Sequence, residues 1–489
     1  MSTIDFNKIL EQLTYNPQAP VIFSSGFFLY LFVAFFAIYL LIFKNEKLRI
    51  FYLTAFSVYF YYKSSGWYFL LLLLLTISDF NLARLMAKTQ KKAYRITLLV
   101  SSLTINLGML AYFKYTNFFF SSFYELMHKP FESFAIFLPV GISFFTFQSL
   151  SYTIDVYRNN IKPLKNITDY AFYLTFFPQM VAGPIVRASD FIPQIFKTPH
   201  VSKEDFGKAI FLISAGLFKK AVISDYISFN FVDRIFENPT LYTGFENLMG
   251  VYGYALQIYC DFSGYSDMAI GIALLLGFKL NINFDSPYKS ASITEFWRRW
   301  HISLSSWLRD YLYISLGGNR KGKIRTYLNL LITMLLGGLW HGAALRFVIW
   351  GALHGIMLAV EKYLKSLFSI PQNKITKVLG ILLTFHFVCF TWIFFRASDM
   401  QTVGEVLLQI STNFHPEIIS EFVVGYPMVI SFIAIGFLLH FTTTRTEYIY
   451  QNFIIRLPFI LKIVYLSLII YLVIQVKSSD IQPFIYFQF

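Results

Sequence analysis

Residues 335–355 read LLGGLWHGAALRFVIWGALHG, an almost wholly apolar run that contains two histidines and an arginine. Such ionisable side chains are costly in hydrocarbon and usually face a cavity, a partner or a substrate when they occur within a membrane. The stretch therefore raises two questions. One is whether the chain crosses a membrane, and the other is what His341, Arg346 and His354 do there.

Composition answers the first question. Of the 489 residues, 56% are hydrophobic and only 14% are charged, whereas soluble domains carry about 25% charged residues. The chain is therefore predicted to be an integral membrane protein in contact with the lipid bilayer. Its net charge of +14 indicates basic cytoplasmic loops in such a protein, so no nucleic-acid partner is expected. Cys260 and Cys389 have no metal-ligand spacing and are interpreted as small buried hydrophobes.

Apolar runs near the roughly 20 residues needed to cross a bilayer recur along the whole chain. The clear ones are 22–43, 66–83, 96–118, 327–345, 378–395, 422–444 and 458–476. Shorter runs broken by Pro or Gly, such as FFPQMVAGPIVR at 176–187, predict kinked or re-entrant segments buried in protein. We predict an all-α polytopic protein of about a dozen membrane helices, with residues 1–489 forming a single domain.

The distribution of lysine and arginine predicts the topology. Basic loops at 44–49, 88–95 and 158–165 are placed inside and the N-terminus outside. The first twenty residues show no basic leader or cleavage site, so the first span is expected to act as the targeting signal.

Residues 292–325 combine tryptophan with arginine. Ser292 followed by Glu295 is typical of a helix N-terminus with a capping box. The apolar residues after it recur at three- and four-residue spacing, as on one helix face: Trp297, Trp300, Leu304, Trp307, Leu308 and Tyr311. Because the arginines fall largely on other faces, we expect a cytoplasmic helix lying at the membrane interface, followed by a basic loop.

Two interpretations of this segment stay open at this level. An interfacial anchor explains its arginines without catalysis, and a functional role for them is the alternative. His301, directly after Trp300, is either a satisfied structural residue or a functional one.

His341 is predicted to lie deep in the membrane. If a helix starts near Tyr327, His341 lies about 14 residues in, or roughly 21 Å along the axis. Gly337, Gly338 and Gly342 allow another element to approach closely. A buried histidine stays neutral and can accept a proton as a general base, although a packing histidine bonded across helices is the alternative.

The other candidates are weaker. His354 and His386 are expected to be structural, and Arg346 to mark the far end of its span. Asp261 and Asp267 lie in a hydrophobic stretch, where a carboxylate is a functional candidate or a helix-bridging group. No carboxylate or cysteine stands at ligand spacing from these histidines, so no metal is predicted.

Several blocks in order carry a family resemblance: LPVGISFFTFQSLSYTIDVYR (138–158), DFSGYSDMAIGIALLLGFKLNINFDSPY (261–288), EFWRRWHISLSSWLRDYLYISLGGNR (295–320) and LLGGLWHGA (335–343). Together they resemble the membrane-bound O-acyltransferase (MBOAT) family, and within it the branch of membrane subunits that O-acetylate alginate.

The resemblance implies tilted transmembrane and re-entrant helices around a central tunnel. It implies His341 in its Trp-His-Gly setting as the catalytic base and His301 as the second catalytic histidine. Trp340, Asp261, Asp267 and Asp310 are further tunnel candidates. Basic residues would bind the phosphates of the donor: Arg298, Arg299, Arg309, Arg320 and Lys321.

The implied function is an O-acetyltransferase in a bacterial inner membrane that binds no permanent cofactor. Acetyl-CoA would be the cytoplasmic donor and a hydroxyl of an exported polysaccharide the final acceptor. An extracytoplasmic partner acetyltransferase of the SGNH-hydrolase kind would carry the acetyl group onward. D-alanyl transfer to teichoic acid from a carrier protein is the rival within the enzyme class. A lipid-linked sugar transporter is the rival outside it, although the internal repeats of many transporters are not evident.

Overall fold

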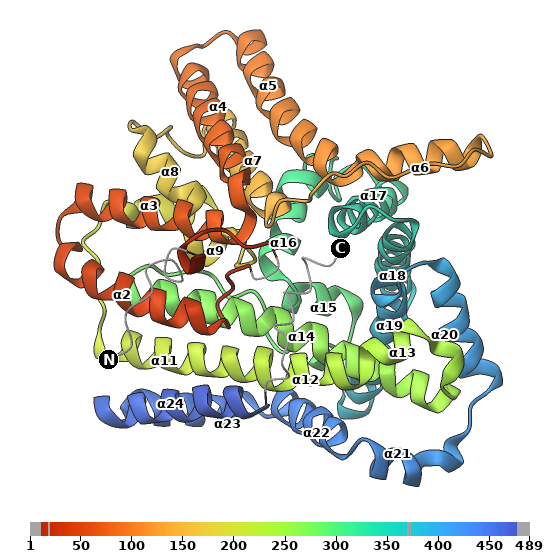
Figure 1. Cartoon of the computed structure of the whole chain (residues 1–489). Helices are drawn as coiled ribbons and strands as arrows, with labels where there is room; N and C mark the ends of the chain where they lie inside the picture. The colour runs from red at the N-terminus through yellow and green to blue at the C-terminus, as the bar shows by residue number, and fades with distance from the viewer. Residues whose placement is uncertain (1–10, 18–19, 369–370, 372, 477–489) are drawn as a thin grey trace. The chain divides into compact units, whose positions relative to one another are not determined.

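The computed structural model describes residues 11–17, 20–368, 371 and 373–476, and in that part of the chain every regular element is a helix (Figure 1). The all-α prediction is confirmed. The helices form two compact units, Met1–Ser202 with Ile272–Asn281 and Lys203–Gly271 with Ile282–Phe489. Whether they form one functional domain stays a prediction.

Among the described residues, five helical segments are long and apolar enough to cross a membrane: Glu46–Lys88, Lys92–Leu126, Leu345–Leu367, Lys374–Arg396 and Phe459–Val476. A sixth span is added if Pro416–Gly425 and Pro427–Phe441, bent by 100° relative to each other, count as one. The multi-pass prediction is therefore confirmed. The prediction of about a dozen membrane helices included segments that do not cross completely. The helices other than these five or six spans are shorter or interrupted.

The first unit contains nine described α-helices: α2 (Gly26–Ile42), α3 (Glu46–Ser65), α4 (Phe69–Lys88), α5 (Lys92–Leu110), α6 (Thr116–Leu126), α7 (Ile142–Tyr157), α8 (Ile167–Thr175), α9 (Phe177–Met180) and α10 (Ala188–Ile195). The four-residue α9 lies in the stretch predicted to be a broken helix, as expected. The basic loops predicted at 88–95 and 44–49 are wrong in part: residues 92–95 begin α5, and Arg49 lies within α3. Arg49 is buried there, and its guanidinium donates to the backbone carbonyls of Phe43, Ile195 and Lys197, which replace its contacts with water.

A buried carboxylate joins four helices of this unit. Asp79 on α4 accepts hydrogen bonds from Ser102 Oγ (2.6 Å) and Asn106 Nδ2 (2.7 Å) on α5, and from Ser149 Oγ (2.5 Å) on α7. Ser149 in turn contacts the hydroxyl of Tyr170 on α8 at 2.7 Å. Three neutral donors thus replace the water that the carboxylate loses on burial.

The second unit holds the remaining helices: α11 (Lys203–Leu217), α12 (Asp225–Ile227), α13 (Asp233–Glu237), α14 (Gly244–Leu275, whose last turn belongs to the first unit), α15 (Ile293–Arg299), α16 (Ile302–Trp307), α17 (Lys323–His341), α18 (Leu345–Leu367), α19 (Lys374–Arg396), α20 (Met400–Thr412), α21 (Ile419–Gly425), α22 (Pro427–Phe441), α23 (Thr444–Arg456) and α24 (Phe459–Val476). Stretches of π-helix precede α12 and α13 and follow α16, at Phe218–Ser224, Ser228–Val232 and Leu308–Tyr313.

Glycines let α17 and α18 pack as a close hairpin, side by side in Figure 1. A Cβ on Gly338 would stand 2.2 Å from the carbonyl oxygen of Phe347, and one on Gly351 would stand 2.4 Å from that of Met334. Neither position tolerates a side chain without separating the helices. The predicted close approach is therefore confirmed at Gly338.

The predicted interfacial helix is not continuous. The Ser292 hydroxyl caps α15 as expected, accepting from Glu295 N, but α15 ends at Arg299 and α16 begins at Ile302. The face predicted to contact lipid packs inside the protein, since Trp300 and Leu304 are each 1% exposed. The segment therefore reaches the interior of the second unit.

Candidate active site

His341 is the last residue of α17, held at a sharp junction with α18. The helix stops because Gly342 is extended (φ −160°), and a Cβ there would stand only 2.0 Å from the ring of Phe347. The hairpin therefore fixes the histidine at the point where the chain turns from α17 into α18.

Aromatic rings surround His341, which is 3% exposed. Its ring centroid lies 5.1 Å from Trp340, 5.1 Å from Trp350 and 5.2 Å from Phe395. These rings come from α17, α18 and α19, so three helices enclose the imidazole and exclude bulk water from it.

His301 occupies the break between α15 and α16 and is fully buried. Its backbone is left-handed (φ 43°, ψ 54°), a conformation uncommon outside glycine although histidine is among the residues that adopt it more often. The Trp340 ring lies 5.9 Å from the ring of His301 and 5.1 Å from that of His341. The fold thus brings both predicted catalytic histidines against one indole.

His354 is engaged at both ring nitrogens. Trp297 Nε1 donates to its Nδ1 at 3.3 Å, so Nε2 carries the proton and donates to Thr391 Oγ1 at 3.0 Å. This arrangement fits the structural role predicted for it. On α22, His440 Nε2 similarly accepts from the backbone N–H of Tyr288 at 3.1 Å.

The predicted tunnel carboxylates form ion pairs. Asp261 and Asp267 on α14 pair with Lys220 and Lys219, respectively, the second pair at 2.5 Å. Lys220 also contacts Asp225 at 2.7 Å. Of the two alternatives, the geometry favours helix bridging. Asp310 pairs with its neighbour Arg309 at 2.6 Å.

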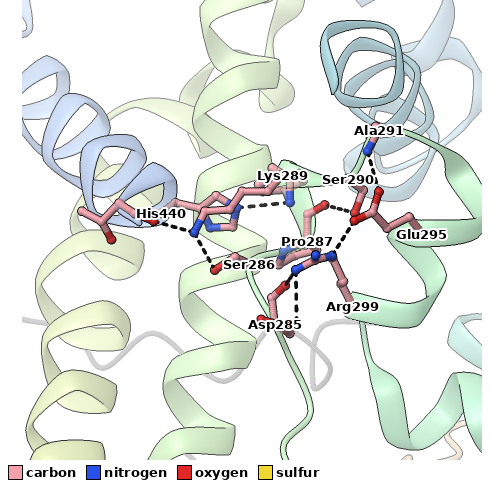
Figure 2. A network of polar contacts seen from close by, with 11 residues as sticks. Asp285, Ser286, Pro287, Lys289, Ser290, Ala291, Glu295, Arg299 and His440 are labelled. Carbon is pink, nitrogen blue, oxygen red and sulfur yellow. Dashed lines mark hydrogen bonds and ion pairs between the residues drawn. The ribbon is translucent and has the colours of Figure 1, made fainter. Parts of the chain in front are cut away.

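Figure 2 shows that Arg299 belongs to a polar network. Its Nε donates to Glu295 Oε1 (3.0 Å), and its Nη1 donates to the backbone and side-chain oxygens of Asp285 (both 3.1 Å). In the same view Lys289 reaches Ser286, and its Nζ donates to the backbone carbonyl of Thr442 at 2.7 Å. Arg299 is therefore committed to holding the chain around residues 285–299.

The remaining basic candidates are exposed, namely Arg298, Arg309, Arg320 and Lys321. Arg346 does not simply mark the end of its span. Its Nη1 donates to the Phe395 carbonyl at 2.7 Å, which ties α18 to α19, and its guanidinium lies 4.2 Å from the Phe347 ring centroid.

The sequence analysis missed Asn283, whose Oδ1 lies 3.2 Å from His301 Nδ1, and the lysines that neutralise the α14 carboxylates. No spacing rule links a residue of the 282–286 connection to a histidine that follows the next α-helix. The adjacent Lys219 and Lys220 in an apolar run were a usable signal, because a buried cation requires a partner. No group of three His, Cys, Asp or Glu that could hold a metal occurs among the described residues. Both cysteines are buried and free, as predicted.

Comparison with known proteins identifies the class of enzyme. Residues 55–398, which include both histidines and Asn283, match the model of the membrane-bound O-acyltransferase family. The chain belongs to this family. It is therefore an O-acyltransferase of the MBOAT type.

Individual relatives are consistent with that assignment. The chain is 42% identical over 392 residues to a probable alginate O-acetylase of Pseudomonas aeruginosa, covering 78% of this chain and 73% of the relative. It is 38% identical to a peptidoglycan O-acetyltransferase of Helicobacter pylori, covering 74% of each. A teichoic acid D-alanyltransferase of Bacillus subtilis is 30% identical, over 55% of this chain and 70% of the relative.

Proposed function

We propose that this MBOAT enzyme transfers an acetyl group from cytoplasmic acetyl-CoA, through the membrane, to a hydroxyl of an exported polysaccharide or of its extracytoplasmic partner enzyme. The polysaccharide acceptor rests on the likeness to alginate and peptidoglycan O-acetylating relatives. The enzyme sits in the bacterial inner membrane with its N-terminus outside, and the partner is of the SGNH-hydrolase kind.

The reaction is a direct acyl transfer. The acceptor oxygen attacks the thioester carbonyl carbon, the C–S bond breaks, and an ester and a free CoA thiol are formed. His341 removes the proton of the attacking hydroxyl as a general base and returns it to the leaving sulfur. No acyl-enzyme is needed to balance these atoms.

The observation that carries the proposal is the contact of Trp340 with both histidines. His301 and His341 lie in separate motifs, and each is at most 3% exposed. Burial keeps the imidazoles neutral, so that a ring nitrogen can accept a proton, and it excludes the water that would hydrolyse the thioester.

The donor phosphates are assigned to exposed cations at the cytoplasmic side. Arg298, Arg320 and Lys321 are the candidates that form no ion pair among the described residues. An arginine can donate two parallel hydrogen bonds to phosphate oxygens, whereas a lysine binds them as a point charge. Arg299 and Arg309, which already pair with carboxylates, contribute less.

The test is acetyl transfer from radiolabelled acetyl-CoA by purified protein in lipid nanodiscs, with and without the extracytoplasmic partner. We expect turnover in the wild type and its loss in His341→Ala. His386→Ala is the matched control, since that histidine is exposed and its Nδ1 contacts the Leu382 carbonyl of its own helix. Full activity of folded His341→Ala would overturn the assignment of the base.

D-alanyl transfer is the second candidate, and the likeness to the Bacillus subtilis enzyme favours it. The same nanodiscs are therefore offered D-alanine on a carrier protein. Transfer from that carrier, with none from acetyl-CoA, would replace the proposed donor and leave the role of His341 intact.

A further inference from the structure

The backbone around His301 is braced by a second segment. Ile302 N donates to the carbonyl of Asn283 at 2.9 Å, and Asp285 N donates to the carbonyl of Arg299 at 2.9 Å. These two bonds hold residues 283–285 beside the break between α15 and α16. A left-handed conformation strains a non-glycine residue, and this pairing helps to maintain it at His301.

The side-chain amide of Asn283 has a defined orientation. Asn283 is 1% exposed, and its Oδ1 accepts from Ser303 N at 3.2 Å and from Ser303 Oγ at 2.9 Å. A backbone N–H can only donate, so the atom facing it must be the amide oxygen. At the other end, Asn283 Nδ2 donates to Ser266 Oγ on α14 at 3.3 Å.

This orientation determines the tautomer of His301. Its Nδ1 lies 3.2 Å from Asn283 Oδ1, an atom that carries no hydrogen. Two lone pairs facing each other at that distance would repel, so Nδ1 carries the proton and donates. A neutral imidazole then has its lone pair on Nε2.

We propose that Asn283 is a positioning residue that fixes His301 as the Nδ1–H tautomer and presents a basic Nε2 to the reacting groups. The inference rests on the proposed function, in which His301 takes part in acetyl transfer. Since Nε2 accepts hydrogen bonds and cannot donate them, His301 positions a donor group of the bound substrates and does not stabilise the oxyanion. The single proton of the attacking hydroxyl is left to His341.

The surroundings keep the ring in this state. The rings of Phe262 and Phe284 lie 4.7 Å and 6.4 Å from the ring of His301 and limit its rotation. Burial lowers the pKa of His301 to about 3, so the imidazole is neutral at working pH and a choice of tautomer exists. Of the charged groups on the packed segments, Asp285 pairs with Arg299, and Asp261 and Asp267 of α14 pair with Lys220 and Lys219, whereas Arg298 is exposed.

The first test does not depend on turnover. In ¹⁵N-histidine-labelled protein, with the His301 signals assigned by their loss in His301→Gln, we expect the chemical shifts of protonated Nδ1 and bare Nε2. Asn283→Leu, which removes the acceptor at similar volume, should give a mixture of tautomers. A wild-type spectrum with protonated Nε2 would overturn the proposal.

Kinetics separate positioning from folding. We expect Asn283→Leu to lower kcat about 10- to 100-fold, the range seen when a metal-ligating histidine loses the partner that orients it, with the KM for acetyl-CoA unchanged. Asn283→Asp keeps the acceptor oxygen and adds a charge that favours imidazolium. This variant should stay active at high pH, and the acid limb of its pH–activity profile should shift to higher pH by at least about one pH unit.

The control is Asn247→Leu. Asn247 is fully buried and bonds the backbone carbonyls of Pro239, Tyr242 and Thr243 at the start of α14. It should lose thermal stability while folded molecules keep their kcat and acid limb. If His301→Gln lost kcat and Asn283→Leu did not, the role of Asn283 would be disproved and the proposed function would stand. If His301→Gln kept its full kcat, His301 would have no part in the proposed function either.

Discussion

Two buried clusters share the α17–α18 hairpin, yet their histidines are held in different ways. Trp350 contacts the rings of both His341 and His354, at 5.1 and 4.8 Å. In the first cluster His301 and His341 meet at Trp340, and the His301 backbone is strained. In the second, Trp297 and Thr391 occupy both nitrogens of His354. Burial and aromatic neighbours are common to both clusters, so these features alone do not separate the histidines that we propose to be reactive from the one that we interpret as structural.

The largest expected effect tests this contrast directly. His341→Gln should lower kcat at least about 100-fold, the lower end of what a general base contributes. It should change the unfolding temperature little. The measurement is initial acetyl-transfer rate per folded molecule, with folding followed by tryptophan fluorescence. Equal losses of kcat in His341→Gln and His354→Gln would contradict the different roles assigned to these two histidines.

The ion pairs on α14 give the next largest effect, on stability. Lys220→Met removes the cation that pairs with Asp261, a carboxylate that is only 2% exposed. Breaking a buried pair costs about 3–5 kcal/mol, so we expect a marked fall in the unfolding temperature in detergent. Lys365→Met is the control, because its pair with Glu361 is exposed on the lysine side and contributes at most about 1 kcal/mol. If Lys220→Met lost turnover while keeping its stability, the reactive region would extend to α14.

A smaller loss of stability is expected in the second cluster. His354→Leu leaves Trp297 Nε1 without its acceptor in the interior and removes the donor to Thr391. An unsatisfied buried group costs about 1–3 kcal/mol. Thermal unfolding should show this, while kcat of the folded fraction stays within about threefold, less than 1 kcal/mol of barrier. A collapse of kcat at unchanged stability would make His354 part of the chemistry.

Sequence alone predicted the helical membrane class, the helix start at Ser292 and the close approach of another element at the glycines near His341. These features depend on composition and on spacings of three or four residues. The break at His301 was not predictable, because the periodicity of Trp297, Trp300 and Leu304 continues through it. Only the tertiary pairing with Asn283 and Asp285 shows that the backbone turns there.

For the candidate site, too, the sequence indicated individual residues but not how the fold brings them together. His301 and His341 stood out as ionisable groups in apolar surroundings, and the family resemblance joined them. Their meeting at Trp340 is a tertiary event, as is the pairing of Asp261 with Lys220. A charge pattern also cannot distinguish Arg298, which is exposed, from Arg299, which is held by two carboxylates.

That difference between neighbouring arginines gives the smallest expected effect. Arg298→Gln should raise the KM for acetyl-CoA by less than about fivefold, because an exposed charge contact contributes about 0.2–1 kcal/mol. The increase should shrink at high salt, which screens exposed charges. Arg299→Gln should instead lower the unfolding temperature slightly and leave KM unchanged, because its guanidinium holds Asp285 and Glu295. The reverse pattern would place the donor phosphates at Arg299, and the network in Figure 2 would then have to open for each donor that binds.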